Sequence, residues 1–317
     1  MDYVKKNPNL VLGLTSIGYD GERFDNVTGL PKPRIDVWPG NFVAIAESCK
    51  SSCSAGLEVI KKTDISTPLG KVLICLVVSA GKVVLAGANK RGELRLVLDA
   101  LYDLTNLIIV DGALNRIAPM AETDCLILVT GAARCLDMPS LALESAYMVD
   151  ILSTPVLAEY GKVESVVSIF SRAAFKAFVD KCHIADSIRI QGIIAEQFLK
   201  ELIALSNRFV NKRLIFDDPM KLLLAGEPLL VWKDLKDISS QSIEIGVEKS
   251  CKLLAITVNP YYPKYRHNRA DYEAAYINKE ELLKSVGSKI KIPCYDVVQQ
   301  GGQAIFQMIM DHRNNLV

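Results

Sequence analysis

The chain has 317 residues, 50% apolar and 23% charged, a composition typical of a globular protein with an ample core. Its formal net charge is +1, so no overall field favours nucleic acid or an acidic membrane surface. The longest apolar stretch, 71–88, is interrupted at Gly81 and is too short to span a bilayer, and the first ten residues lack the apolar region of a signal peptide. We therefore expect a cytoplasmic protein that binds neither nucleic acid nor membranes.

The pattern of apolar residues predicts the elements of the first half in chain order: strands at 10–15 and 41–47, a helix-like segment at 48–60, hairpin strands at 71–78 and 82–87, a helix at 91–105, and strands at 107–113 and 124–133. The helix has Leu94, Val97, Leu98 and Leu101 on one face.

The second half continues the alternation of helices and strands: a helix at 139–157, a strand at 163–170, a helix at 173–182, a strand at 186–192, a helix at 193–205, strands at 213–218 and 252–262, a helix at 268–286 and a last strand at 290–298.

Several of these strands are apolar on both faces, as in parallel sheets covered by helices. We therefore predict an α/β fold with a doubly wound, mostly parallel sheet, Rossmann-like or P-loop-NTPase-like, and a β-hairpin insertion at 71–88. The expected division is a P-loop-like half at 1–135 and a second α/β half at 136–317, which can pack into the same sheet.

The eight cysteines are scattered, and several stand in apolar strands, which favours buried reduced thiols over disulfides. Cys49 and Cys53 are four residues apart, but no second cysteine or histidine pair stands at zinc spacing.

Ligands of open α/β sheets sit at the carboxyl ends of the strands, so the residues there are candidates for binding a nucleotide or another anion. These residues are small or polar: Gly13, Thr15, Ser16, Gly18, Asp111, Gly112, Arg116, Thr130, Gly131 and Asn259. Because small polar residues also make ordinary turns, the set is as consistent with turns as with a nucleotide pocket.

Gly13 and Gly18 have the glycine spacing of a phosphate-binding P-loop, and Asp111 ends an apolar strand as a Walker B aspartate does. In P-loop enzymes that aspartate helps to hold Mg²⁺, so Asp111 is a candidate ligand for that ion. The lysine and the serine or threonine of a P-loop are missing, because Tyr19 and Asp20 follow Gly18. Tyr19, Asp20, Glu22 and Arg23 therefore indicate a recognition loop rather than phosphate chemistry.

The segment at 261–269 combines three tyrosines with four basic residues if His267 is counted. It is consistent with a contact for a partner or an anion, but a solvated loop is the simpler interpretation.

Short phrases in a constant order resemble a known family: TSIGYDGE at 15–22, PKPRI at 31–35, STPLGKV at 66–72, IVDGALNR at 109–116, ILVTGAA at 127–133, ITVNP at 256–260 and PCYDVV at 293–298. Together they resemble the smaller, non-MutS-like subunit of the reactivase that accompanies adenosylcobalamin-dependent lysine 5,6-aminomutase. The resemblance covers most of the chain and is strongest over 10–135.

The resemblance implies a non-catalytic accessory subunit rather than a stand-alone enzyme. Such a reactivase exchanges damaged cobalamin on the aminomutase for intact cofactor and uses ATP, and a MutS-like partner subunit carries the standard P-loop. The resemblance thus implies two partners, the MutS-like ATPase and the aminomutase. It implies no tightly bound cofactor, since Mg-ATP would occupy at most a shared site and this chain would meet cobalamin only through the client enzyme.

Two other functions compete with this interpretation. A stand-alone P-loop kinase or ligase would bind nucleotide by itself, but the missing lysine argues against it. An NAD-dependent Rossmann enzyme would need a G-x-G-x-x-G loop and an acidic residue about twenty positions further on, and neither stands at a convincing place.

Overall fold

The computed structural model describes residues 7, 9–21, 23–112, 118–205 and 209–315. They form two compact units. Unit 1 contains 1–123, 263–275 and 303–317, and unit 2 contains 124–262 and 276–302. The chain first passes from unit 1 to unit 2 between Thr123 and Asp124, and it crosses between the two units several times.

Unit 1 is built on a five-stranded sheet with the order β5-β6-β4-β1-β9. Its strands are β1 (Leu12–Ile17), β4 (Phe42–Ala46), β5 (Gly56–Thr67), β6 (Gly70–Ser79) and β9 (Leu107–Gly112). β1 runs parallel to both β4 and β9, whereas β4–β6 and β5–β6 are antiparallel pairs. Every residue of β1 is buried, as expected for a strand covered on both faces.

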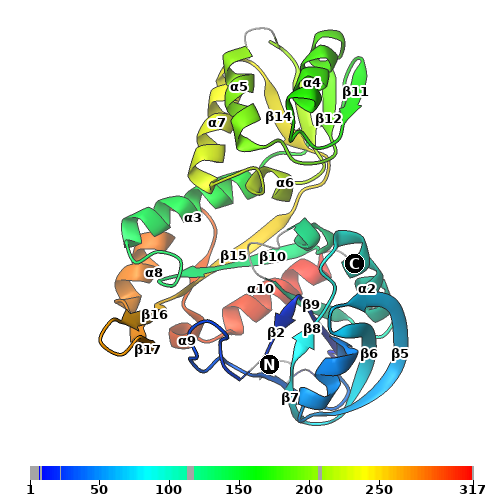
Figure 1. Ribbon diagram of the computed structural model, residues 1–317, viewed down its shortest axis with the longest axis vertical. Helices are drawn as coiled ribbons and strands as arrows, with labels where there is room; N and C mark the ends of the chain where they lie inside the picture. Colours follow the sequence, from blue (N-terminus) through cyan, green and yellow to red (C-terminus); the bar gives the residue numbers. More distant parts are fainter. Residues whose placement is uncertain (1–6, 8, 22, 113–117, 206–208, 316–317) are drawn as a thin grey trace. The chain divides into compact units, whose positions relative to one another are not determined.

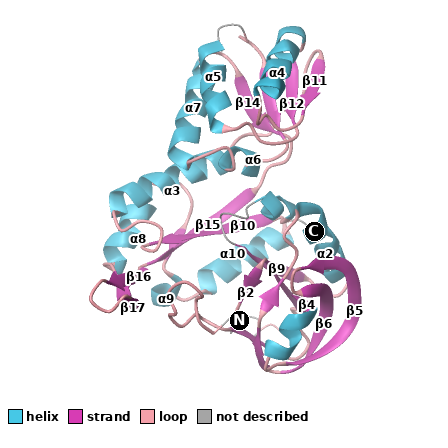
Figure 2. Ribbon diagram, viewed as in Figure 1, coloured by secondary structure: helices cyan, strands magenta, loops and turns pink. Residues whose placement is uncertain are grey.

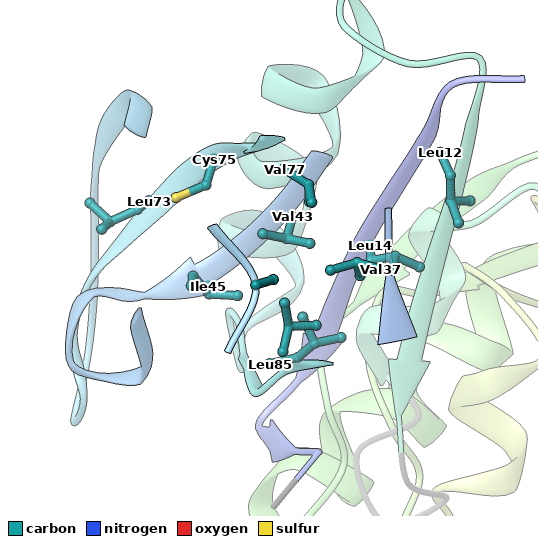
Figure 3. Packing of buried hydrophobic residues seen from close by; sticks show 11 residues of the cluster. Leu12, Leu14, Val37, Val43, Ile45, Leu73, Cys75, Val77 and Leu85 are labelled. Carbon is teal, nitrogen blue, oxygen red and sulfur yellow. The ribbon is translucent and has the colours of Figure 1, made fainter. Parts of the chain in front are cut away.

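Alternating side chains of this sheet form two separate hydrophobic clusters. The first includes Leu12 and Leu14 of β1 and is closed by side chains from short antiparallel ribbons (Figure 3). Those ribbons pair β2 (Tyr19–Asp20) with β8 (Leu85–Ala86), and β3 (Ile35–Val37) with β7 (Gly81–Val83). Strands rather than a helix thus cover this face.

Helix α2 (Arg91–Tyr102) covers the second cluster. Leu94, Val97 and Leu101 are fully buried there, and Leu98 is partly buried against them, as the sequence periodicity predicts. Unit 1 also contains the 3₁₀ helices η1 (Glu47–Ser52) and η3 (Ala118–Glu122) and the C-terminal helix α10 (Gln303–Asn314).

Unit 2 contains two parallel sheets, visible as separate groups of arrows in Figure 2. The three-stranded sheet has the order β10 (Cys125–Gly131), β15 (Lys252–Asn259), β18 (Cys294–Tyr295). The four-stranded sheet has the order β11 (Val163–Val166), β12 (Ser187–Ile190), β13 (Arg213–Phe216), β14 (Glu244–Val247). The prediction of a mixed α/β protein with largely parallel pairing is confirmed.

Seven helices belong to the described part of unit 2 (Figure 1): α3 (Met138–Leu152), α4 (Arg172–Ile184), α5 (Glu196–Leu205), α6 (Met220–Leu223), α7 (Pro228–Ser240), α8 (Lys279–Gly287) and α9 (Val297–Gln300). Asp137 caps α3 by accepting a hydrogen bond from the Ser140 N–H, and Pro139 occupies its first turn. None of the helices in the described residues combines the length and the apolarity needed to cross a bilayer.

The prediction that 71–78 and 82–87 pair with each other as a hairpin is wrong. β6 pairs with β5 and β4, and the chain after Ser79 divides into β7 and β8, which pair with β3 and β2. The helix-like segment predicted at 48–60 contains most of η1 and the start of β5 instead of an α-helix. The β-branched residues Val59, Ile60 and Thr63 favour a strand there, and this preference overrides the spacing of Cys49 and Cys53.

The helix expected at 268–286 is also wrong over its first half. β16 (Tyr261–Arg266) and β17 (Asp271–Tyr276) form a two-stranded sheet, and α8 begins only at Lys279. Ring contacts join Tyr265 to Tyr272, with centroids 5.1 Å apart, and Tyr261 to Tyr276, at 5.7 Å. These cross-strand aromatic pairs stabilise the hairpin and outweigh the local helical preference.

Replacement of Leu101 by alanine tests the packing of α2 on the sheet. Leu101 is fully buried and Leu96, on the same helix, is 58% exposed. We expect Leu101→Ala to lower the free energy of unfolding by about 2–5 kcal/mol, because it leaves a cavity, and Leu96→Ala to change it by less than about 0.5 kcal/mol. Trp38 and Trp232 are the only tryptophans, so Trp38 fluorescence in a Trp232→Phe background reports urea unfolding of unit 1 alone. Equal effects of the two alanine replacements would contradict the packing described.

Candidate functional site

The segment 13–18 is not a phosphate-binding loop. Gly13 lies inside the buried strand β1, where a side chain would press on Thr105. The Thr15 hydroxyl donates to the Ala44 carbonyl at 3.2 Å and the Ser16 hydroxyl donates to the Gly18 carbonyl at 2.8 Å. β1 then turns at Gly18 into β2 and not into a helix, so no helix N-terminus faces a phosphate here.

Two glycines make the turn after β1 possible. Gly18 has φ +92° and Gly21 has φ +86°, values that other residues rarely adopt. At Gly21 a Cβ atom would also stand 2.8 Å from the Val83 carbonyl oxygen. These glycines let β2 pair with β8 and place Asp20 beside the carboxyl end of the sheet.

The parallel pairing of β1 with β9 brings Asp111 to the same place. Its register sets Ser16 opposite Asp111 and Ile17 opposite Gly112. Gly112 is a packing residue, since an added Cβ would lie 2.3 Å from the Met120 Cε atom. The side chains of Asp111 and Asp20 are joined by a hydrogen bond, so two carboxyl groups from distant parts of the chain meet here.

Lys32 completes this group, and its place was not predicted as a site residue. Its Nζ atom lies 3.0 Å from Asp20 Oδ1, and both side chains are about 30% exposed (28% and 31%). The only sequence signal was its position between two prolines in the phrase PKPRI. We call Asp20, Lys32 and Asp111 the carboxylate–lysine cluster.

Below about pH 6 the carboxyl pair holds a proton, and that proton resides on Asp111. Burial and the hydrogen bond and charge of Asp20 raise the pKa of Asp111 from 3.8 to about 6, although the Gly112 N–H and Lys32 oppose this. Burial also raises the pKa of Asp20, but the hydrogen bonds from Asp111 and Lys32 outweigh it and leave that pKa below its usual value. A carboxylic acid on Asp111 thus donates to an Asp20 carboxylate that is also paired with Lys32.

The loop that carries Lys32 is a compact turn. Lys32 N–H donates to the Arg23 carbonyl at 3.1 Å, and Phe24 forms a bridge with Pro31. Asp25 Oδ1 accepts hydrogen bonds from the backbone of Val27 and from both the N–H and the hydroxyl of Thr28, at 2.8–3.0 Å. This network orders a proline-rich segment that cannot form a regular helix, and it holds Lys32 toward Asp20.

Apolar side chains of the same region face solvent. Tyr19 is 44% exposed, Phe24 is 47% exposed and Val27 is 82% exposed. The guanidinium of Arg23 lies 5.1 Å from the centre of the Phe24 ring. Glu22 and Arg116, two other predicted site residues, lie outside the described residues.

The remaining candidates belong to unit 2, where they serve the pairing of β10 with β15. Gly131 is opposite Asn259 and Thr130 is opposite Val258. Gly131 has φ +155°, and a Cβ atom there would lie 2.0 Å from the Asn259 carbonyl oxygen. Asn259 Oδ1 accepts a hydrogen bond from the Tyr261 N–H at 3.0 Å, which turns the chain toward β16. The expected strand ends are thus distributed over two sheets in two units.

A divalent ion at Asp111 would find two protein ligands. Asp20 and Asp111 offer carboxylate oxygens, and Mg²⁺ commonly takes one or two such ligands and fills the other positions with water or phosphate oxygens. Within the residues described, no group of three or more histidine, cysteine, aspartate or glutamate side chains is placed to hold a metal.

Comparison with models of known protein families found no match, and comparisons with curated proteins and with solved structures found no significant match.

The shared proton predicts a pH dependence of stability. Because the pKa of Asp111 is raised to about 6 in the folded chain, protonation stabilises the fold below the ordinary value of 3.8, and this contribution is lost as the pH rises through 6. Asp111→Asn should remove this pH-dependent loss of stability. The free energy of unfolding of the variant should therefore rise relative to that of the parent chain as the pH increases from 4 to 7. Urea unfolding across this range measures it, with the exposed Asp64 replaced by asparagine as the control. A ¹³C carboxyl titration of Asp111 with a midpoint near 4 would contradict the shared proton.

Proposed function

We propose that this chain is an accessory subunit of a reactivase for an adenosylcobalamin-dependent lysine 5,6-aminomutase, working with a MutS-like ATPase. The observation that carries the proposal is the convergence of three of the phrases on one cluster. Asp20 belongs to TSIGYDGE, Lys32 to PKPRI and Asp111 to IVDGALNR, and their side chains interact directly. The phrase IVDGALNR, far from the other two in sequence, thus shares one place in the fold with them.

Three of the other phrases support the proposal in the same way. ILVTGAA and ITVNP meet where Gly131 lies opposite Asn259, and PCYDVV joins the same sheet through the pairing of Thr257 with Tyr295. A resemblance carried by residues that contact one another is stronger than one carried by isolated turns, since each contact constrains both partners.

The division of labour follows from the geometry of unit 1. The segment 13–18 lacks both the lysine and the helix of a P-loop, so we assign ATP binding and hydrolysis to the MutS-like partner. This chain would meet cobalamin only through the client enzyme, on which the damaged cofactor is exchanged. The task of this chain would be recognition, and the stand-alone kinase or ligase has no support from the described residues.

The surface proposed for recognition is the turn at 23–32 together with Tyr19. Its exposed apolar residues, Tyr19, Phe24 and Val27, stand next to the charged cluster, a mixture typical of protein interfaces. The ion pair of Lys32 with Asp20 fixes the turn relative to β2, so the surface is preorganised before the partner binds.

A reactivation assay tests the function. Aminomutase that carries inactive cobalamin is incubated with this chain, the MutS-like ATPase, Mg-ATP and fresh adenosylcobalamin, and we expect its activity to return. Omission of either the chain or ATP should prevent the return. No recovery with all components present would refute the proposed function.

The double replacement Phe24→Ala with Val27→Ala tests the surface separately. Both side chains are exposed, so the fold should persist, but loss of apolar contacts should weaken partner binding by about tenfold or more. Val78→Ala, which removes an exposed side chain elsewhere in unit 1, is the matched control and should leave binding unchanged. Normal binding and reactivation by the double variant would show that the turn is structural only.

A further inference from the structure

The turn at 23–32, which we call the recognition turn, presents Phe24 and Val27 to solvent. Val27 is 82% exposed, so packing against other side chains does not fix its position. Backbone hydrogen bonds fix the base of the turn, where Asp25 N–H donates to the Leu30 carbonyl at 2.9 Å. The tip of the turn therefore depends on a different interaction.

One carboxylate oxygen orders the tip of the recognition turn. Asp25 Oδ1 accepts hydrogen bonds from the Val27 N–H at 3.0 Å, from the Thr28 N–H at 2.8 Å and from the Thr28 hydroxyl at 3.0 Å. Among the described residues, neither of these two N–H groups has another acceptor. Because the acceptor is ionised, these bonds are stronger than bonds between neutral groups. Asp25 thus ties Val27 to Phe24, which directly precedes Asp25 in the chain.

The Asp25 carboxylate stays charged at neutral pH. The hydrogen bonds from Thr28, with that of the backbone N–H as the largest cause, hold the pKa of Asp25 below its usual value of 3.8. The pKa of Asp111, by contrast, is raised to about 6. The order of the tip therefore does not change with pH in the range where the charge of Asp111 does.

The bonds of Asp25 and the ion pair of Lys32 with Asp20 have different effects. The ion pair joins the base of the turn to β2 and so fixes where the turn lies. The bonds of Asp25 act within the turn and fix its shape. An exposed loop loses conformational freedom when it binds, so order that is already present in the free chain lowers the entropic cost of binding. Asp25 thus affects affinity without contacting the partner.

We propose that Asp25 is a positioning residue for partner recognition: its Oδ1 atom holds Phe24 and Val27 in the arrangement that the MutS-like ATPase subunit contacts. The inference rests on the proposed function for the identity of the partner. The order that Asp25 imposes on the turn is a property of this chain alone. The two parts are therefore tested separately.

Backbone NMR of the full chain tests the order of the turn without any partner. In Asp25→Ala the order parameters of the Val27 and Thr28 amides should fall from about 0.85 to below about 0.6, because their acceptor is removed. In Asp25→Asn they should stay at the values of the parent chain, since the side-chain amide oxygen accepts the same bonds. The conservative variant therefore separates the hydrogen-bonding role from the charge.

Two further variants locate the cause. Thr28→Val removes only the hydroxyl donor, so the loss of amide order should be smaller than in Asp25→Ala. Asp64→Ala makes the same change at an exposed aspartate that pairs with Lys71, and it should leave the turn unchanged. Unchanged order in Asp25→Ala, or an equal loss of order in Asp25→Asn, would overturn the proposal.

Calorimetry with the MutS-like ATPase subunit tests the effect on recognition. Asp25→Ala should weaken binding by about tenfold through lost preorganisation, whereas Asp25→Asn should stay within about threefold of the parent chain, because asparagine supports the same turn. Urea unfolding of unit 1, followed by Trp38 fluorescence in the Trp232→Phe background, should have the same midpoint in both variants. Unchanged affinity in Asp25→Ala, or a loss of affinity matched by a loss of stability, would contradict the positioning role. Absence of binding by the parent chain would refute the proposed function and the partner named, while NMR still decides whether Asp25 orders the turn.

Discussion

The parallel pairing of β1 with β9 is the constraint on which the site depends. These strands are separated by about ninety residues, and their register sets Ser16 opposite Asp111. Burial of β1 on both faces fixes that register, because a slip by one residue would exchange Leu12 and Leu14 with Gly13 and Thr15. The carboxylate–lysine cluster therefore follows from the core of unit 1.

The cluster combines features that have opposite effects on stability. Two carboxyl groups in contact repel each other when both are ionised, and here a shared proton and the ammonium group of Lys32 relieve that repulsion. The result is a pair whose charge changes near neutral pH, next to a turn with exposed apolar residues. Such an arrangement suits a surface that must be fixed in shape yet remain able to contact a partner.

The cluster is assembled from strand ends and a proline-rich turn of unit 1. A local irregularity of the backbone sets the place of Asp20, because Gly21, which follows it, has φ +86°.

The sequence by itself determined the mixed α/β class, the apolar face of α2 and the presence of polar residues at strand ends, because local periodicity depends only on near neighbours. It placed Asp20 and Asp111 among the candidates but missed Lys32. The glycine spacing that resembles a phosphate-binding loop belongs mostly to the buried strand β1. The tertiary structure alone decided that β6 pairs with β5, that 261–276 forms a hairpin, and that the strand ends belong to two units. Contacts between residues far apart in sequence decide which strands pair, and local sequence patterns do not specify these contacts.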